Sequence, residues 1–140
     1  MKIVMVSGHF DPLHKGHIDH MRKASELGSV IVVVGSDAQI KEKYGFVMKP
    51  LHERIQRIFK KAPFIQGVVV SIDKDSTSVE TLKMIRPQYF AKGGDRIPSN
   101  MPRVEIETCK EIGCEIVYGV QGVIKSSTKI RNRILRFQGK

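Results

Sequence analysis

One uninterrupted apolar segment, Val-Ile-Val-Val-Val-Gly at residues 30–35, constrains the fold more than any other part of the chain. A strand with one wet face alternates polar and apolar residues, whereas this segment contains no polar side chain. It therefore predicts a strand that is buried on both faces, as in a parallel sheet covered by helices. Parallel strands need crossover connections, which are usually helices, so helices should separate this strand from its neighbours.

The rest of the chain alternates in this way. Further short segments rich in β-branched or aromatic residues predict strands at residues 2–7, 67–72, 89–91 and 114–118. Apolar residues at helical spacing predict helices at residues 16–27, 50–59, 78–86 and 101–112. The pattern predicts an α/β, Rossmann-like, doubly wound fold, with a mostly parallel five-stranded sheet and helices on both faces.

Two finer expectations concern helix faces and one loop. The inner faces of the last two of these helices should be formed by Val79, Leu82, Met84, Ile85, Val104, Ile106, Cys109 and Ile112. Residues 41–49 have no clear period and carry three lysines, so they predict a mobile basic loop.

Composition limits the class of protein. With 140 residues the chain fits a single domain, 1–140, and its 41% hydrophobic and 27% charged residues are typical of a globular protein. No apolar run reaches transmembrane length and no signal-peptide pattern is present, so we expect a cytoplasmic location without a membrane partner. Cys109 and Cys114 show no metal or redox spacing and should be reduced and buried. The net charge of +10 predicts attraction to polyanions, either nucleotides or nucleic acid.

The first strand runs into Gly-His-Phe-Asp-Pro-Leu-His-Lys-Gly-His at residues 8–17. His14 and His17 are three residues apart where a helix begins, so both rings should lie on one side, near the positive end of the helix dipole. Gly16 lets an anion approach the backbone N–H groups, and the segment therefore predicts a phosphate site. Half of a zinc site and a purely structural pair are the alternatives, although no cluster of further metal ligands accompanies the histidines. His20 and His52 are expected to be surface residues.

Other polar residues follow the later strands. Asp37 comes after the second strand and should lie on the same sheet edge as the histidines. Lys92-Gly93-Gly94-Asp95 follows the fourth strand, and its glycines allow a ligand to approach the backbone closely. Residues 125–131 open a last helix with hydroxyl and basic side chains, which predicts an anion site or, alternatively, a simple helix cap. Asp73 and Asp75 are expected to cap a helix and to form a turn.

The segment at residues 8–17 resembles the first signature of the cytidylyltransferase-like nucleotidyltransferases, and residues 125–131 resemble the second. The resemblance covers nearly the whole chain. It implies phosphate contacts and catalytic roles for His14 and His17, and a lysine, Lys41 or Lys43, that closes on the phosphates. It further implies nucleotide contacts for Gly8, His9, Phe10, Asp11, Gly16, Arg54, Ser126, Ser127, Thr128 and Lys129. The chain departs from the family at His9, where a small or β-branched residue is usual.

Lys92-Gly93-Gly94-Asp95 resembles the branch that activates sugar phosphates, notably the bacterial heptose-phosphate adenylyltransferases. This implies acceptor contacts for Asp37, Lys92, Gly93, Gly94 and Asp95. Arg96 stands where that branch usually has an aromatic residue, and Gln121 stands where the cytidylyltransferases have an arginine. Neither a Walker phosphate loop nor a dinucleotide Gly-x-Gly-x-x-Gly motif occurs, which argues against a P-loop kinase and a dehydrogenase.

The resemblance implies an enzyme that transfers a nucleoside monophosphate from ATP or CTP to a phosphorylated sugar and releases pyrophosphate. Mg²⁺ would accompany the nucleoside triphosphate, and no metal site built from protein ligands is expected. Glycerol 3-phosphate or another polyol phosphate with CTP, flavin mononucleotide and pantetheine phosphate are alternative acceptors. A basic nucleic-acid-binding module is an alternative of another class, but a chain with 6% aromatic residues and no tryptophan is a poor stacking platform. A homodimer is also expected in this family.

Overall fold

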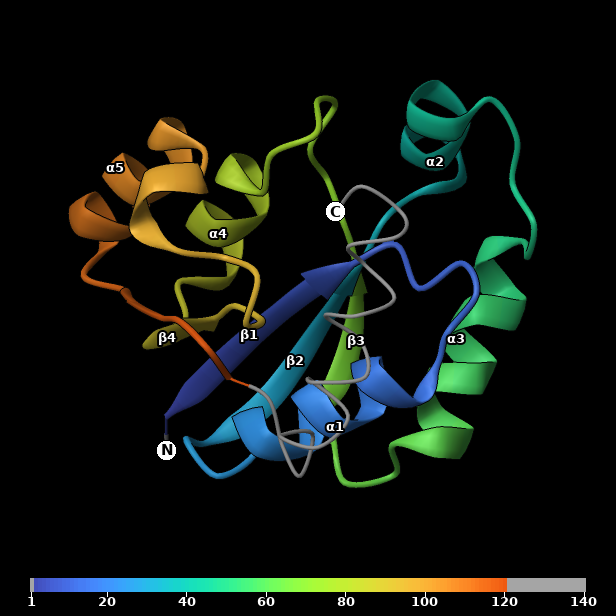
Figure 1. Cartoon of the computed structure of the whole chain (residues 1–140), viewed down its shortest axis with the longest axis horizontal. Coiled ribbons are helices and arrows are strands. Elements are labelled where there is room, and N and C mark those ends of the chain that lie inside the picture. Colours follow the sequence, from blue (N-terminus) through green and yellow to red (C-terminus); the bar gives the residue numbers. More distant parts are fainter. Residues whose placement is uncertain (1, 121–140) are drawn as a thin grey trace.

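The computed structural model describes residues 2–120 (Figure 1). Along the chain the elements are β1 (Ile3–Gly8), α1 (Lys15–Ala24), β2 (Ser29–Val34), α2 (Asp37–Tyr44), α3 (Leu51–Lys61), β3 (Gly67–Val70), α4 (Val79–Ile85), β4 (Tyr89–Ala91), the 3-10 turn η1 (Pro98–Asn100), α5 (Arg103–Ile112) and β5 (Glu115–Val117).

The five strands form one sheet in the order β3-β2-β1-β4-β5, and every pair in it is parallel. The predicted fold class is confirmed. The chain winds outward from β1 through β2 to β3, and then crosses back to place β4 and β5 on the other side of β1. Because the winding reverses between β1 and β4, a crevice opens at their carboxyl ends, which is where open α/β sheets bind ligands.

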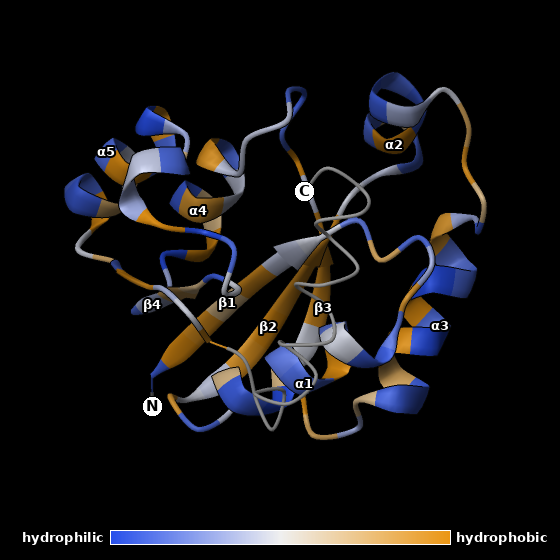
Figure 2. Cartoon of the chain, in the orientation of Figure 1, coloured by the Kyte–Doolittle hydropathy of each residue, from blue (hydrophilic) through white to orange (hydrophobic). Residues whose placement is uncertain are grey.

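Alternate residues of the central strands face two separate helix layers. Val4, Val6, Val30 and Val32 pack with α1 and α3 on one face. Met5 and Val33 point the other way and pack with residues of α4 and α5. The uninterrupted apolar segment therefore fills both layers, and the strands are the most apolar ribbons in the molecule (Figure 2).

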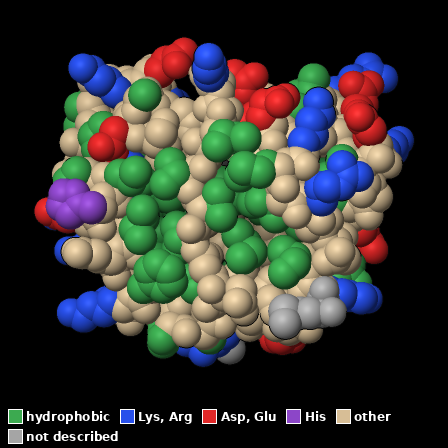
Figure 3. Space-filling view, turned by 180° about the vertical axis from the view of Figure 1, so that it is seen from behind, with side chains coloured by type: hydrophobic (Ala, Val, Ile, Leu, Met, Phe, Trp, Pro, Cys, Tyr) green, Lys and Arg blue, Asp and Glu red, His purple; other side chains and the backbone are tan. Residues whose placement is uncertain are grey.

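The face away from α1 and α3 is covered less completely. Ile31 and Val69 alternate with residues that pack against α1 and α3, so they point to this face, where they are only half-buried. Seen from behind, hydrophobic side chains gather across the middle of the molecule, with charged side chains around the edges (Figure 3). Part of the surface is therefore apolar even though the whole chain is strongly basic.

The prediction of a mobile loop at residues 41–49 is wrong for residues 41–44, because these belong to helix α2 (Asp37–Tyr44). Ser36 caps this helix: its hydroxyl accepts a hydrogen bond from the Gln39 N–H, and the Gln39 side chain accepts one from the Ser36 N–H. Gly45, with φ of 87°, ends the helix in the left-handed conformation. The helix is held by its two caps and not by an apolar stripe, since Ile40 is its only buried residue.

Two predictions of helix faces are also wrong. Val104 and Met84, which were expected to be inner residues, are 48% and 50% exposed. The predicted Cys109 is buried and Ile106 and Ile112 pack against the core, while Glu105 and Thr108 are buried in α5 without having been predicted. Cys109 and Cys114 are buried and unpaired by a disulfide, as predicted. Within residues 2–120, no helix is long and apolar enough to cross a membrane.

Candidate active site

His14 and His17 meet at the start of α1. His14 is the residue before the first helical turn, in extended conformation, and its ring stacks on that of His17 with 3.6 Å between centroids and 21° between planes. The His14 N–H donates a hydrogen bond to His17 Nδ1 at 3.1 Å. In the neutral ring this bond assigns the remaining proton of His17 to Nε2, so that atom is a donor suited to a phosphate oxygen.

Phe10 fixes the position of this pair. Its buried ring meets His17 edge-on, with 4.9 Å between centroids. The other side of the ring lies so close to Gly8 that a Cβ at that position would come within 2.8 Å of it. Gly8 is therefore required by packing, and Phe10 acts on the site by supporting His17.

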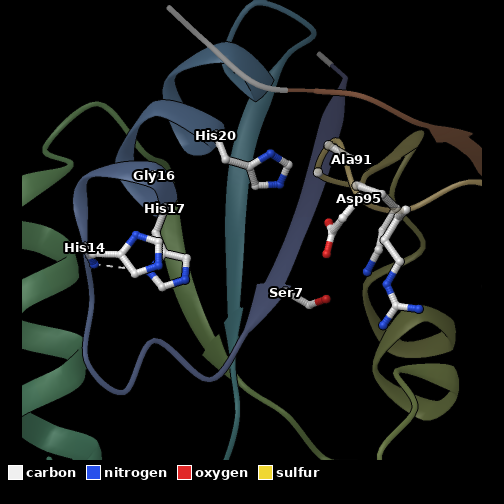
Figure 4. Close-up of a pocket in the computed structure, with 10 residues that line it drawn as sticks. Ser7, His14, Gly16, His17, His20, Ala91 and Asp95 are labelled. Carbon is white, nitrogen blue, oxygen red and sulfur yellow. Dashed lines mark hydrogen bonds between the residues drawn. The ribbon is translucent and has the colours of Figure 1, made fainter. Parts of the chain in front are cut away.

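The two histidines line a cavity at the switch point, which we call the histidine compartment (Figure 4). It lies between the start of α1 and the segment that follows β4, so residues distant in sequence face each other across the end of β1. The compartment is lined by Ser7, His14, Gly16, His17, His20, Ala91, Lys92, Gly93, Asp95 and Arg96. The structure thus brings the first predicted motif together with Lys92, Gly93 and Asp95.

His20 belongs to this compartment, although the sequence suggested a surface residue. Its ring faces the compartment (Figure 4). Its Nδ1 contacts the backbone oxygen of Val120. The signal was its spacing, because residues 14, 17 and 20 follow one another at intervals of three on one side of α1. His52, also expected on the surface, is exposed on α3.

A second cavity continues from the first across the ends of β1, β2 and β3. We call it the hydroxyl compartment because hydroxyl side chains dominate its wall. It is lined by Ser7, Gly8, His9, Val33, Gly35, Gln39, Lys43, Ser71, Ser76, Thr77, Ser78, Lys92, Arg96, Pro102 and Glu105. Most of these residues carry no sequence motif, and only the edge of the sheet on which they lie could be predicted.

Lys92 and Arg96 line both compartments. The Lys92 ammonium lies 4.5 Å from the centre of the Phe90 ring, and burial lowers the pKa of this lysine. Arg96 donates a hydrogen bond from Nη1 to the backbone oxygen of Asn100 at 2.8 Å. A phosphate located between the two compartments would therefore meet two cations from the segment after β4.

Arg54 lies beneath the site and not in it. Its side chain is fully buried, and its guanidinium donates to the backbone oxygens of His9, Gly35 and Lys49 at 2.6–3.0 Å and to Asp37 Oδ1 at 2.6 Å. These bonds join α3 to the segments that follow β1 and β2. The nucleotide contact predicted for Arg54 stays a prediction, and the structure gives this residue a positioning role.

Several other predicted residues are placed at the rim of the site. The Asp11 carboxylate accepts hydrogen bonds from the N–H groups of Met48 and Lys49 at 2.8 and 2.7 Å, so it anchors the segment after α2. Asp37 pairs with Arg54, and the described walls of the two compartments contain neither Asp37 nor Gly94. Of the two candidate lysines, Lys43 lines the hydroxyl compartment, whereas Lys41 is absent from the described linings of both.

His9 fills the corner between β1 and β2. Its ring packs so closely on Gly35 that no side chain fits there, and it meets Tyr44 edge-on at 5.8 Å between centroids. Within the described chain, His9 Nδ1 is a buried polar atom with no hydrogen-bond partner. Burial, and then the nearby Lys43 and Arg54, lower the pKa of this histidine, so the ring is held in its neutral form.

Ser126, Ser127, Thr128 and Lys129 lie outside the described residues, so their predicted phosphate contacts stay predictions. In the described part of the chain, no three His, Cys, Asp or Glu side chains come together to hold a metal ion. The described donors of the site are imidazole, ammonium and guanidinium groups, which suit phosphate oxygens. If Mg²⁺ enters with a triphosphate, as the family resemblance implies, phosphate oxygens and not a cluster of the described side chains would hold it.

Comparison with known proteins identifies the family. A model of the cytidylyltransferase-like family matches residues 5–133. The bifunctional protein HldE of Nitratiruptor sp. is 34% identical over 134 residues, which cover 95% of this chain and 28% of that protein. The bifunctional protein HldE of Geobacter metallireducens is 33% identical over 141 residues, which cover 99% of this chain and 28% of that protein. The chain thus spans less than a third of the length of these relatives.

The fold also has solved relatives. The crystal structure of the lipopolysaccharide core biosynthesis protein from Thermoplasma volcanium matches with a TM-score of 0.71 and 22% identity, covering 86% of this chain and 98% of that chain. This match shows a shared fold. With the family model over most of the sequence and the histidine pair at the switch point, the chain belongs to the cytidylyltransferase-like family of nucleotidyltransferases.

Proposed function

We propose that the chain transfers the adenylyl group of ATP to a phosphorylated sugar and releases pyrophosphate. The observation that carries this proposal is the pair of connected compartments, one lined by the stacked histidines and the other by hydroxyl groups, with Lys92 and Arg96 lining both. A reaction of two phosphorylated substrates needs such a place, where two phosphates meet among fixed positive charges. CTP with a polyol phosphate is the runner-up and would use the same site.

The reaction needs no nucleophile from the protein. A phosphate oxygen of the acceptor attacks the α-phosphorus of ATP, a new P–O bond forms, and the bond to the bridging oxygen breaks as pyrophosphate leaves with its electrons. His14 and His17 donate to phosphate oxygens, next to the positive end of the α1 dipole, and so stabilise the charge that accumulates there. Mg²⁺, when bound with the triphosphate, neutralises part of the same charge.

Lys43 and Lys92 have separate tasks in this scheme. Lys43 lies on α2 at the wall of the hydroxyl compartment, so it attracts the acceptor phosphate. Lys92 stands where the two compartments meet, so it holds the two anions together against their mutual repulsion. Lys41 lies on the same helix but does not line the described wall of either compartment, so only the family resemblance makes it a candidate.

A pyrophosphate-release assay tests the proposal. The protein is incubated with Mg²⁺, each of the four nucleoside triphosphates, and a panel of sugar 1-phosphates, polyol phosphates, flavin mononucleotide and pantetheine phosphate. We expect release with ATP and a sugar 1-phosphate. Release only with CTP and a polyol phosphate would establish the runner-up, and no release with any pair would contradict the proposed function.

A further inference from the structure

Glu105 is the single carboxylate on the described wall of the hydroxyl compartment. It comes from the first turn of α5 and is 4% exposed. Its Oε2 accepts a hydrogen bond from the Ser78 N–H at 2.9 Å. None of the ion pairs formed within residues 2–120 includes this carboxylate. A buried acid therefore lies beside the site with one oxygen engaged, and Lys92 and Arg96 act on it from beyond direct ion-pair distance.

The hydrogen bond to Ser78 does not explain the negative charge. A glutamine in the same position could accept that bond through its amide oxygen, and it would avoid the cost of burying a charge. Burial raises the pKa of Glu105, whereas the nearby Lys92 lowers it. A buried acid at position 105 thus lowers the stability of the folded protein. We therefore look for the role of Glu105 in the cavity that it lines.

The second oxygen of the carboxylate, Oε1, accepts no hydrogen bond from the described residues. A carboxylate oxygen in a partly dry site is a strong acceptor for hydroxyl groups. The groups around it are of matching chemistry, since serine and threonine hydroxyls and the Gln39 amide can both donate and accept. Among the described lining residues, only Val33 and Pro102 have apolar side chains, so an apolar or aromatic ligand finds little to bind there.

Positive charge lines the same compartment, close enough to Glu105 that Lys92 and Arg96 both lower the pKa of its carboxyl group, which burial raises. Lys92 and Arg96 lie where it joins the histidine compartment, and Lys43 lies on the wall formed by α2. An acceptor whose phosphate occupies this junction would find Glu105 and the hydroxyl groups on the same wall for its remaining atoms. The compartment thus combines cations for a phosphate with an acid and hydroxyl groups for the rest of the molecule.

We propose that Glu105 selects the acceptor by accepting hydrogen bonds from hydroxyl groups of a polyhydroxylated phosphate, whose phosphate group lies between Lys92 and Arg96. This inference rests on the proposed nucleotidyl transfer and specifies which part of the site recognises the second substrate. It assigns the acceptor to the sugar and polyol phosphates. It disfavours flavin mononucleotide, whose ribityl hydroxyls fit but whose aromatic ring meets little apolar surface here, and pantetheine phosphate, which has a single free hydroxyl.

The test compares Glu105→Gln with Glu107→Gln in steady-state pyrophosphate release, varying ATP and the best acceptor separately. Glu107 lies on the same helix, and its carboxylate forms a solvent-exposed pair with Arg103. We expect Glu105→Gln to raise the KM of the acceptor about 10- to 100-fold, because it removes a charged hydrogen-bond acceptor, while the KM of ATP changes less than about twofold. Glu107→Gln should leave both values unchanged.

Deoxy analogues of the acceptor provide a second readout. Removing the hydroxyl that Glu105 binds should weaken the parent enzyme but have little further effect on Glu105→Gln, since the same interaction is lost either way. Equal rises in both KM values would mean that Glu105 only supports the fold, and would overturn the inference. An unchanged acceptor KM in an active Glu105→Gln variant would also overturn it. A parent protein that releases no pyrophosphate with any acceptor would overturn the proposed function, and the inference with it.

Discussion

At the scale of single residues, the site depends on groups whose orientation or pKa is set by their surroundings. His17 is oriented by the N–H of His14, and His9 is held neutral by burial with Lys43 and Arg54 nearby. Glu105 keeps a carboxylate in a buried position that a neutral side chain could fill. Each of these features is costly or unusual for a structural residue, and each lies at the same edge of the sheet.

His9 gives a prediction about pH. Its pKa is lowered in the folded protein, so the native ring stays neutral as the pH falls below the ordinary histidine value of about 6.5, whereas the unfolded chain binds a proton there. The free energy of unfolding should therefore decrease on going from pH 7 to pH 5, with part of the decrease coming from His9.

The measurement is urea denaturation at pH 7 and pH 5 for the parent and for His9→Thr, which has the β-branched residue usual in the family. The free energy of unfolding of His9→Thr should decrease less between pH 7 and pH 5 than that of the parent. Only the difference between the two pH values is compared, because the variant also loses the contact with Tyr44. An identical decrease in both proteins would show that His9 titrates normally.

At the scale of elements, loops and helix ends are fixed by a few polar side chains. Asp73 caps α4, accepting hydrogen bonds from the N–H groups of Glu80 and Thr81, and Asp75 forms a turn with Thr77, so both predictions from the sequence are confirmed. Asp11 anchors the segment after α2 in the same way. These bonds position the lysines of α2 and the wall of the hydroxyl compartment.

Arg54 is the strongest of these connections and gives a prediction about stability. Arg54→Lys keeps the charge but cannot reach all four acceptors, so at least two of them lose a charged donor. We expect a loss of at least about 2 kcal/mol in the free energy of unfolding. Arg57→Lys, on the exposed side of the same helix, is the control and should change stability by less than about 0.5 kcal/mol. Equal effects of the two substitutions would rule out the positioning role.

At the scale of the whole molecule, the sequence predicts the architecture well because apolar periodicity reports burial directly. Residues 30–35 indicated a strand covered on both faces, and the sheet bears this out. The same reasoning failed for α2, whose stability comes from its caps. In α5 it correctly predicted Ile106, Cys109 and Ile112 as inner residues but was wrong for Val104 and missed the buried Glu105. Apolar periodicity identifies only apolar inner residues, so it cannot predict a buried acid.

The site could be predicted only where a motif carries it. His14 and His17 were expected together, and Lys92 was expected to contact the acceptor, but only the fold shows that Lys92 lines the same cavity as the two histidines. Ser7, His20, Arg96 and Glu105 were missed, because their roles depend on which distant segments the fold brings together. The homodimer stays a prediction, which sedimentation equilibrium would test; the half-buried Ile31 and Val69 show that the sheet still has apolar surface to cover.

The most direct test of the account is the pyrophosphate-release rate of His17→Ala with the best substrate pair, measured beside His52→Ala as a control on an exposed histidine. His17→Asn accompanies it, because asparagine can still accept from the His14 N–H but lacks the donor at the imidazole position. We expect both His17 variants to lose on the order of a hundredfold in turnover, as for other electrostatic donors to a developing charge, and His52→Ala to keep the parent rate. Near-full turnover by folded His17→Ala would contradict the central claim that the histidine pair stabilises the reacting phosphates.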